Sequence, residues 1–282
     1  MTGEGAVLRA KIELVRPALD VASGLLWHSP DPSAAYARYL AAMYPVTRAA
    51  VPLMRFARRR CLRHPADRLS RPLISFLTRH IHEERGHDLW VGADLAALGE
   101  DPGRLAGALP VPAITGLIGG QYQLIADVHP IALLGCIALL ESAPPGAPLI
   151  EHVRGFTRQA GATATLSGHA ASDSAHGQAV FALLDGLRLD ARLRAAVGYS
   201  ALHTARQAVA LFGELVSGDR PAQIRTGEPT AGYWSEANDD AEFLISSRSE
   251  GEAAMLIDIE DAMAGHADVM AHSADVIGGL FL

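Results

Sequence analysis

A helix-forming stretch between residues 66 and 98 places acidic and imidazole side chains on the face that should enter a hydrophobic core. At 100° per residue, His80, Glu84 and His87 fall within an arc of about 60°. The same side of the helix carries the apolar residues Leu73, Leu77, Val91 and Leu98. A buried carboxylate is costly unless it is paired or bound to a metal. The fold must therefore bring compensating groups from elsewhere in the chain against this helix.

The composition favours an all-α protein. Ala, Leu and Gly abound in the 282 residues, whereas runs of β-branched residues are scarce. We expect a bundle of about seven helices with a C-terminal helical appendage. Residues 1–220 should form the helical domain. Residues 221–282 should form an irregular segment and a C-terminal helix that packs on the same domain.

Prolines, glycines and the apolar periodicity divide the chain into expected helices. The stretch 66–98 is expected as one helix or as two collinear pieces. The other expected helices cover residues 5–27, 33–60, about 112–127, 131–141, 149–186, 189–217 and 241–280.

Charge and cysteine content narrow the classes of partner and location. The formal net charge is −7, and the one basic run, Arg55 to Arg63, is typical of a solvated helix end or a salt-bridge face. We therefore expect no nucleic-acid partner. Two cysteines without a CxxC motif, and an N-terminus unlike a signal peptide, predict a cytoplasmic location. The longest uncharged run, between Arg104 and Asp127, contains prolines and glutamines and indicates a buried helix rather than a membrane span.

Two further stretches offer the compensation that the first helix requires. The apolar stretch 131–141 ends in Glu141, which either enters the core or caps the helix end. The i, i+4, i+7 spacing of His169, Asp173 and His176 places all three on one helix face. A lone histidine is usually a satisfied core or surface residue. Three ligand-type residues on one stripe, matched by a similar stripe on another helix, indicate a metal site instead.

The three helices together predict a metal centre. Mixed nitrogen and oxygen ligands suit iron or manganese better than a metal that prefers thiolates, and di-iron sites in helical bundles use inward carboxylates and imidazoles in this way. His80 is either a further ligand or a residue that orients a ligand carboxylate. Glu83 falls less centrally on the helix, and His82 falls on its outer face. The predicted ligands are Glu84, His87, Glu141, His169, Asp173 and His176.

In order and spacing, these stretches resemble the motifs of the haem-oxygenase-like di-iron oxidases and oxygenases, often called iron-containing redox enzymes. The matching motifs are His80-x-x-Glu-Glu84-x-x-His87, residues 129–141 ending in Glu141, and His169-x-x-x-Asp173-x-x-His176. The resemblance covers roughly residues 40–215. It implies a haem-oxygenase-like fold without haem, two irons per chain that cycle between Fe(II) and Fe(III), and O2 as co-substrate.

The resemblance also implies an activity. Members of this family N-oxygenate amines or cleave C–C bonds oxidatively, often in natural-product biosynthesis, so we expect a small amine or amino-acid-like substrate. A homodimer is the default assembly, and a reductant is a candidate partner. No membrane partner is expected, and no catalytic residue beyond the metal ligands.

Two alternatives stay open at this point. The first is a haem oxygenase or a thiaminase-like enzyme of the same fold, in which Cys136 would be compared with the nucleophilic cysteine. Because Cys136 lies on an apolar helix, we interpret it as a packing residue. The second alternative is a non-catalytic helical bundle that binds a metal or a partner protein.

Overall fold

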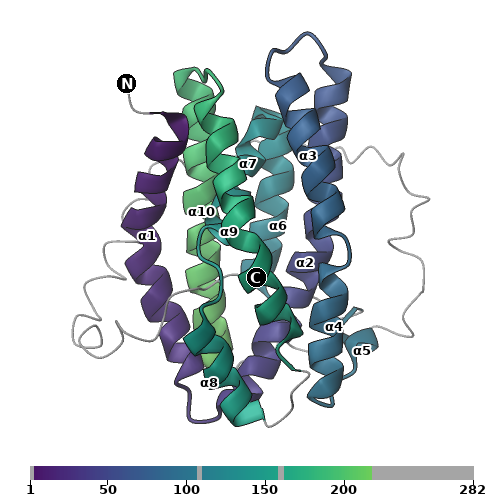
Figure 1. Cartoon of the computed structure of the whole chain (residues 1–282), viewed down its shortest axis with the longest axis vertical. Coiled ribbons are helices and arrows are strands. Elements are labelled where there is room, and N and C mark those ends of the chain that lie inside the picture. The colour runs from purple at the N-terminus through teal and green to yellow at the C-terminus, as the bar shows by residue number, and fades with distance from the viewer. Residues whose placement is uncertain (1–2, 107–109, 158–161, 218–282) are drawn as a thin grey trace.

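The computed structural model describes residues 3–106, 110–157 and 162–217. Within these ranges the chain is helical and contains no strand, which confirms the all-α prediction. The long helices stand roughly upright beside one another, with α1 along one side of the bundle and α3 and α4 along the other (Figure 1). The domain boundary near residue 220 and the helix expected over 241–280 lie outside the described residues, and both stay predictions.

The helices follow the chain in an order close to that expected. They are α1 (Glu4–Trp27), α2 (Pro32–Arg63), α3 (Ser70–Glu84), α4 (His87–Ala97), α5 (Pro102–Ala106), α6 (Pro112–Gln123), a π-helical turn (Leu124–Val128), a 3-10 turn (Pro130–Ala132), α7 (Leu133–Glu141), α8 (Ala147–Thr157), α9 (Ala164–Asp185) and α10 (Ala191–Ser217).

The stretch 66–98 is broken into two helices at the predicted metal site. Arg85 has an extended backbone, and Gly86 has a φ of 90°, a conformation that glycine adopts without steric cost. Glu84 is therefore the last residue of α3, and His87 is the first residue of α4. His80 and Glu84 therefore share one face of α3, as expected. His87 lies on a different helix, so the expected common face of all three residues is not formed.

The stretch 149–186, expected as one helix, instead forms α8 and α9. Helix α9 begins at Ala164, and its N-cap residue, Thr163, forms no side-chain capping bond. Its first amides are satisfied from another helix. Asp94 of α4 accepts hydrogen bonds from the backbone N–H groups of Ala164 and Thr165, both at 2.8 Å. The expectation of one helix was wrong because the signal that starts α9 lies about 70 residues earlier in the chain.

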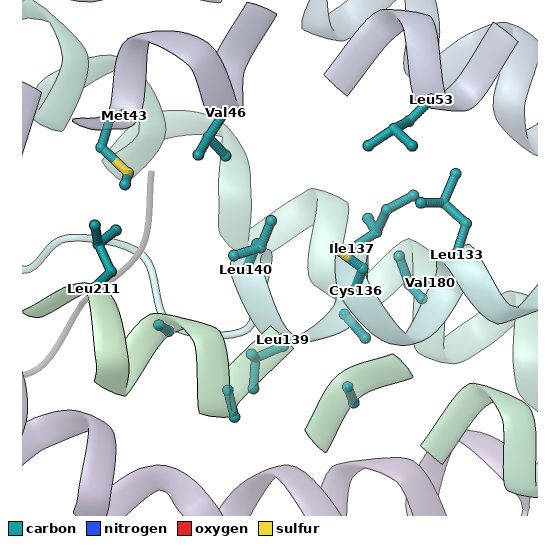
Figure 2. Packing of buried hydrophobic residues seen from close by; sticks show 14 of the residues in the cluster. Met43, Val46, Leu53, Leu133, Cys136, Ile137, Leu139, Leu140, Val180 and Leu211 are labelled. Atoms are coloured by element: carbon teal, nitrogen blue, oxygen red, sulfur yellow. The ribbon is translucent and has the colours of Figure 1, made fainter. Parts of the chain in front are cut away.

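Helix α7 is the centre of the fold. Every one of its residues is buried, including Glu141 at its end. A Cβ on Gly135 would lie 2.1 Å from the carbonyl oxygen of Val197, so glycine is needed for the close packing of α7 on α10. Figure 2 shows apolar side chains of α7 between those of α2 and α10; the labelled ones include Leu133, Ile137, Leu140, Met43, Val46, Leu53 and Leu211.

In the part of the chain that the structure describes, no helix has both the length and the apolar character needed to cross a membrane.

Candidate metal centre

Four ligand-type side chains converge between α3, α7 and α9. One ligand atom from each of His80, Glu84, Glu141 and His176 lies within 4.8 Å of the others. The Nε2 atom of His80 is 2.7 Å from Oε1 of Glu141. The Nδ1 atom of His176 is 3.6 Å from Oε1 of Glu84 and 3.9 Å from Oε1 of Glu141. This group includes His80, whose role the sequence left open.

The other three predicted ligands form a neighbouring group around the start of α4. The Nδ1 atom of His87 lies 3.0 Å from Oε2 of Glu84. On α9, Nδ1 of His169 lies 3.1 Å from Oδ1 of Asp173. The rings of His87 and His169 meet edge to face, with their centroids 5.0 Å apart.

Glu84 stands between the two groups. Its Oε1 atom faces His176 in the first group, and its Oε2 atom faces His87 in the second. A carboxylate in this position can offer one oxygen to each of two cations. Its place at the C-terminal end of α3, next to the turn at Gly86, brings the two groups together.

Buried side-chain atoms of the site that lack a hydrogen-bond partner fit a bound metal. Glu141, His169 and Asp173 are almost fully buried, with 6%, 2% and 1% of their surface exposed. Five buried atoms of the candidate ligands have no hydrogen-bond partner among the described residues: Nδ1 of His87, Oε2 of Glu141, Nε2 of His169, Oδ2 of Asp173 and Nδ1 of His176. Buried polar atoms are normally paired. Nitrogen and carboxylate-oxygen donors left open in this way are the donor set that iron accepts.

The electrostatics of the groups favour a cation at their centre. Burial raises the pKa of Glu141 to about 7, although the hydrogen bond from His80 opposes the rise. Burial also raises the pKa of Asp173, against the lowering effect of His169. Burial acts to raise the pKa of Glu84 as well, but the nearby imidazoles outweigh it and the pKa is lowered. The acids are held near imidazoles because neither buried charge is stable alone.

The pKa values of His80 and His176 are shifted in opposite directions. Burial alone would lower the pKa of His80, but its bond to Glu141 outweighs burial and the pKa is raised. Burial and the neighbouring His80 lower the pKa of His176, so this ring is favoured in its neutral form. A neutral imidazole is the form that binds a metal.

Aromatic rings and glycines hold the ligands in place. Trp90 stacks on His87 at 4.1 Å and meets His169 edge to face at 5.7 Å. A Cβ on Gly168 would lie 2.4 Å from the Trp90 ring, so glycine makes room for that ring. Phe76 stacks on His80 at 5.3 Å. These contacts restrict the rotamers of three imidazoles.

The structure also shows two acids whose position the sequence did not reveal. Asp94 is fully buried and caps α9 from α4, as described above. Glu83, judged less central from the helix geometry, has its Oε2 atom 3.4 Å from Nδ1 of His80 and 3.6 Å from Nε2 of His176. The i, i+3 spacing of Glu83 from His80 was the one sequence signal that could have indicated this contact.

A solved structure with a similar architecture identifies the fold. A domain of unknown function with a heme oxygenase-like fold from Shewanella denitrificans superposes with a TM-score of 0.62. The sequences are 20% identical, and the match covers 73% of this chain and 91% of that chain. The chain therefore has a heme oxygenase-like fold that holds a buried cluster of histidines and acids able to bind metal.

The sequence profile of the iron-containing redox enzymes matches residues 37–211, so the chain belongs to that family. This confirms the family predicted from the three motifs. No curated protein matches the sequence.

Proposed function

We propose that the chain is a non-haem di-iron oxygenase or oxidase. The observation that carries this proposal is the position of Glu84, which directs one carboxylate oxygen toward each of two ligand groups. His80, Glu141 and His176 would hold one iron together with Glu84. His87, His169 and Asp173 would hold the other. An iron pair, when bound, supplies the electrons and the open coordination positions that O2 chemistry needs.

The protein's own contribution is to orient the ligands and to keep water out. All seven side chains come from helices rather than loops, and most are nearly fully buried. Phe76 stacks on His80 in the first group, and Trp90 stacks on His87 in the second. Each ligand group is therefore covered by one aromatic ring. A rigid site with apolar walls suits the containment of a reactive oxidant.

An open groove beside the site supports a small-molecule substrate. It lies between α3 and α9, has a volume of about 410 Å³, and is lined by Pro72, Ser75, Phe76, Arg79, Ala179, Ala182 and Leu183. Phe76 belongs both to this groove and to the packing around His80. Arg79 offers a half-exposed guanidinium at the groove, which could bind a substrate carboxylate.

The substrate class that we propose is a small amine or amino acid. The expected reaction is N-oxygenation or oxidative C–C cleavage, with O2 as co-substrate and an external reductant. The apolar lining of the groove and its single cationic side chain agree with an amphipathic carboxylate. The expectation that the substrate is an amine comes from the family resemblance and not from the groove.

A thiol-based reaction has little support in the geometry. Cys136 is buried on α7, and burial raises the pKa of its thiol to about 12. The thiolate is the nucleophilic form of cysteine. A protonated thiol inside the core is consistent with packing against its neighbours, as we interpreted it from the sequence.

Anaerobic titration with Fe(II) tests the proposal. The wild-type chain should bind two irons, and admission of O2 should then cause O2 consumption that depends on an amine or amino acid. Glu84→Ala should weaken the binding of both irons, since Glu84 faces both ligand groups. A His169→Ala/His176→Ala double variant should lose iron binding and O2 consumption together.

The matched control is His82→Ala, which removes an exposed imidazole from α3, the helix that carries Glu84. This variant should bind two irons like the wild type. Failure of the wild-type chain to bind iron, or full O2 consumption in the double variant, would exclude the di-iron assignment.

A further inference from the structure

Glu83 is placed between two histidines of the same ligand group. A single oxygen, Oε2, lies 3.4 Å from Nδ1 of His80 and 3.6 Å from Nε2 of His176. The two rings meet edge to face with centroids 5.0 Å apart, so one carboxylate oxygen can reach both. Glu83 is about one-third exposed, whereas the ligands beside it are nearly buried.

The two nitrogens that face Glu83 are those that point away from the cluster. His80 directs its other nitrogen, Nε2, toward Glu141 at 2.7 Å. His176 directs its other nitrogen, Nδ1, toward Glu84 at 3.6 Å, and this buried atom has no hydrogen-bond partner. A neutral imidazole that binds metal through one nitrogen carries its proton on the other. Both N–H groups would then point at the same oxygen of Glu83.

The Glu83 carboxylate is itself held in position. Its second oxygen, Oε1, lies 3.8 Å from Nε of Arg79, one helical turn away. The Arg79 guanidinium also lies over the ring of Phe76, 5.7 Å from its centroid. Since Phe76 also stacks on His80, the two groups that flank the Glu83 carboxylate, Arg79 and His80, both pack on one aromatic ring.

We propose, building on the di-iron assignment above, that Glu83 is a positioning residue for one iron of the pair. It fixes His80 as an Nε2 donor and His176 as an Nδ1 donor. The ion pairs of His87 and His169 in the described structure go to Glu84 and Asp173, which are themselves assigned ligands. Loss of Glu83 should therefore affect the His80 and His176 group and spare the other.

Iron titration of the full-length Glu83→Ala variant tests this inference. Carboxylates that orient metal-bound histidines are worth about 10- to 100-fold in metal affinity. One of the two irons should be bound more weakly by that factor, and the second should be bound as in the wild type. Glu83→Gln should give an intermediate affinity, because its carbonyl oxygen can still accept from an imidazole N–H group.

A purely structural role for Glu83 would have a different result. It would lower the unfolding temperature of the iron-free protein and weaken both irons alike. Glu151→Ala is the matched control, since Glu151 is an exposed acid on α8 that pairs with Arg154 at 2.6 Å. This control should bind both irons normally.

The outcomes separate the inference from the function on which it rests. Two tightly bound irons in both the wild type and Glu83→Ala would overturn the role of Glu83 and leave the di-iron proposal standing. Equal weakening of both irons in Glu83→Ala would also overturn it. A wild-type chain that binds no iron would overturn both.

Discussion

Among single residues, a glycine of α9 allows α9 to pack closely against α7 beside the candidate metal centre. A Cβ on Gly177 would lie 2.7 Å from the carbonyl oxygen of Glu141. Gly177 follows His176 directly, so this contact sets the distance between α9 and α7 where both carry proposed ligands. The atom that a larger residue would meet belongs to the backbone and cannot turn aside as a flexible side chain can.

We expect Gly177→Ala to force α7 and α9 apart at the metal centre. Overpacking of this kind costs about 1–3 kcal/mol, and iron affinity should fall with it. Urea unfolding of the iron-free protein and Fe(II) titration measure the two effects. Gly213→Ala on α10 is the control, because Gly213 is exposed and a Cβ there has no neighbour within 4 Å. That change should stabilise the helix by about 0.5–1 kcal/mol. Equal stability of the two variants would contradict the close approach.

The ligand-type residues were visible in the sequence for a physical reason. Acids and imidazoles on an apolar helix face must be compensated, so Glu84, His169 and Asp173 stand out without any structure. The role of Glu83 could not be found in the same way. Its partner His80 lies one turn back on the same helix, but His176 lies on α9, and a contact between two helices does not follow from the angles within one of them.

Among the helices, α4 and α9 are joined by one buried carboxylate. Asp94 is fully buried and accepts the first amides of α9 through both of its oxygens, each at 2.8 Å. An acid at a helix N-terminus is stabilised by the free N–H groups and by the helix dipole. Because α4 begins with His87 and α9 carries His169, this cap fixes the distance between two proposed ligands.

We expect Asp94→Asn to lower the free energy of unfolding by about 2–4 kcal/mol, since the amide can accept only one of the two N–H groups and buries an unmatched donor. Asp31→Asn is the matched control. Asp31 caps α2 through one exposed oxygen, which accepts from Ala34 at 3.0 Å, and Asn caps a helix about as well as Asp. Denaturant unfolding of both variants measures the difference. A loss in Asp94→Asn no larger than that in Asp31→Asn would show that the cap is dispensable.

The boundaries of most helices follow from local signals, whereas the start of α9 does not. Proline begins α2 and α6 at the expected places, and Gly99, with a φ of 82°, follows the end of α4. The N-cap residue of α9, Thr163, forms no side-chain capping bond, and Asp94 of α4 supplies the cap through space instead. The sequence indicates a cap when the capping residue is adjacent to the helix in the chain. It does not indicate one, such as Asp94, that reaches the helix only through the tertiary structure.

For the molecule as a whole, the family match begins at residue 37, yet α1 lies before it and is part of the packed core. Leu8 and Ile12 are 3% and 1% exposed. The backbone N–H of Gly5 donates to Asp185 at the end of α9, and Arg194 at the start of α10 pairs with Glu4 at 2.6 Å. The amphipathic pattern of residues 5–27 predicted a helix there, but the faces that it covers, α9 and α10, follow only from the fold.

Two substitutions on α1 test whether this helix is integral to the fold. Ile12→Asp places a carboxylate in the hydrophobic core, because Ile12 is 1% exposed. We expect a loss of more than about 4 kcal/mol, which is a large share of the roughly 5–15 kcal/mol that stabilises a typical domain. Leu14→Asp is the control two residues away, because Leu14 is 76% exposed and the change should alter stability by less than about 0.5 kcal/mol. Circular dichroism during thermal unfolding distinguishes them. If Ile12→Asp melts at the same temperature as Leu14→Asp, α1 is an appendage, and the bundle that holds the metal centre is complete without it.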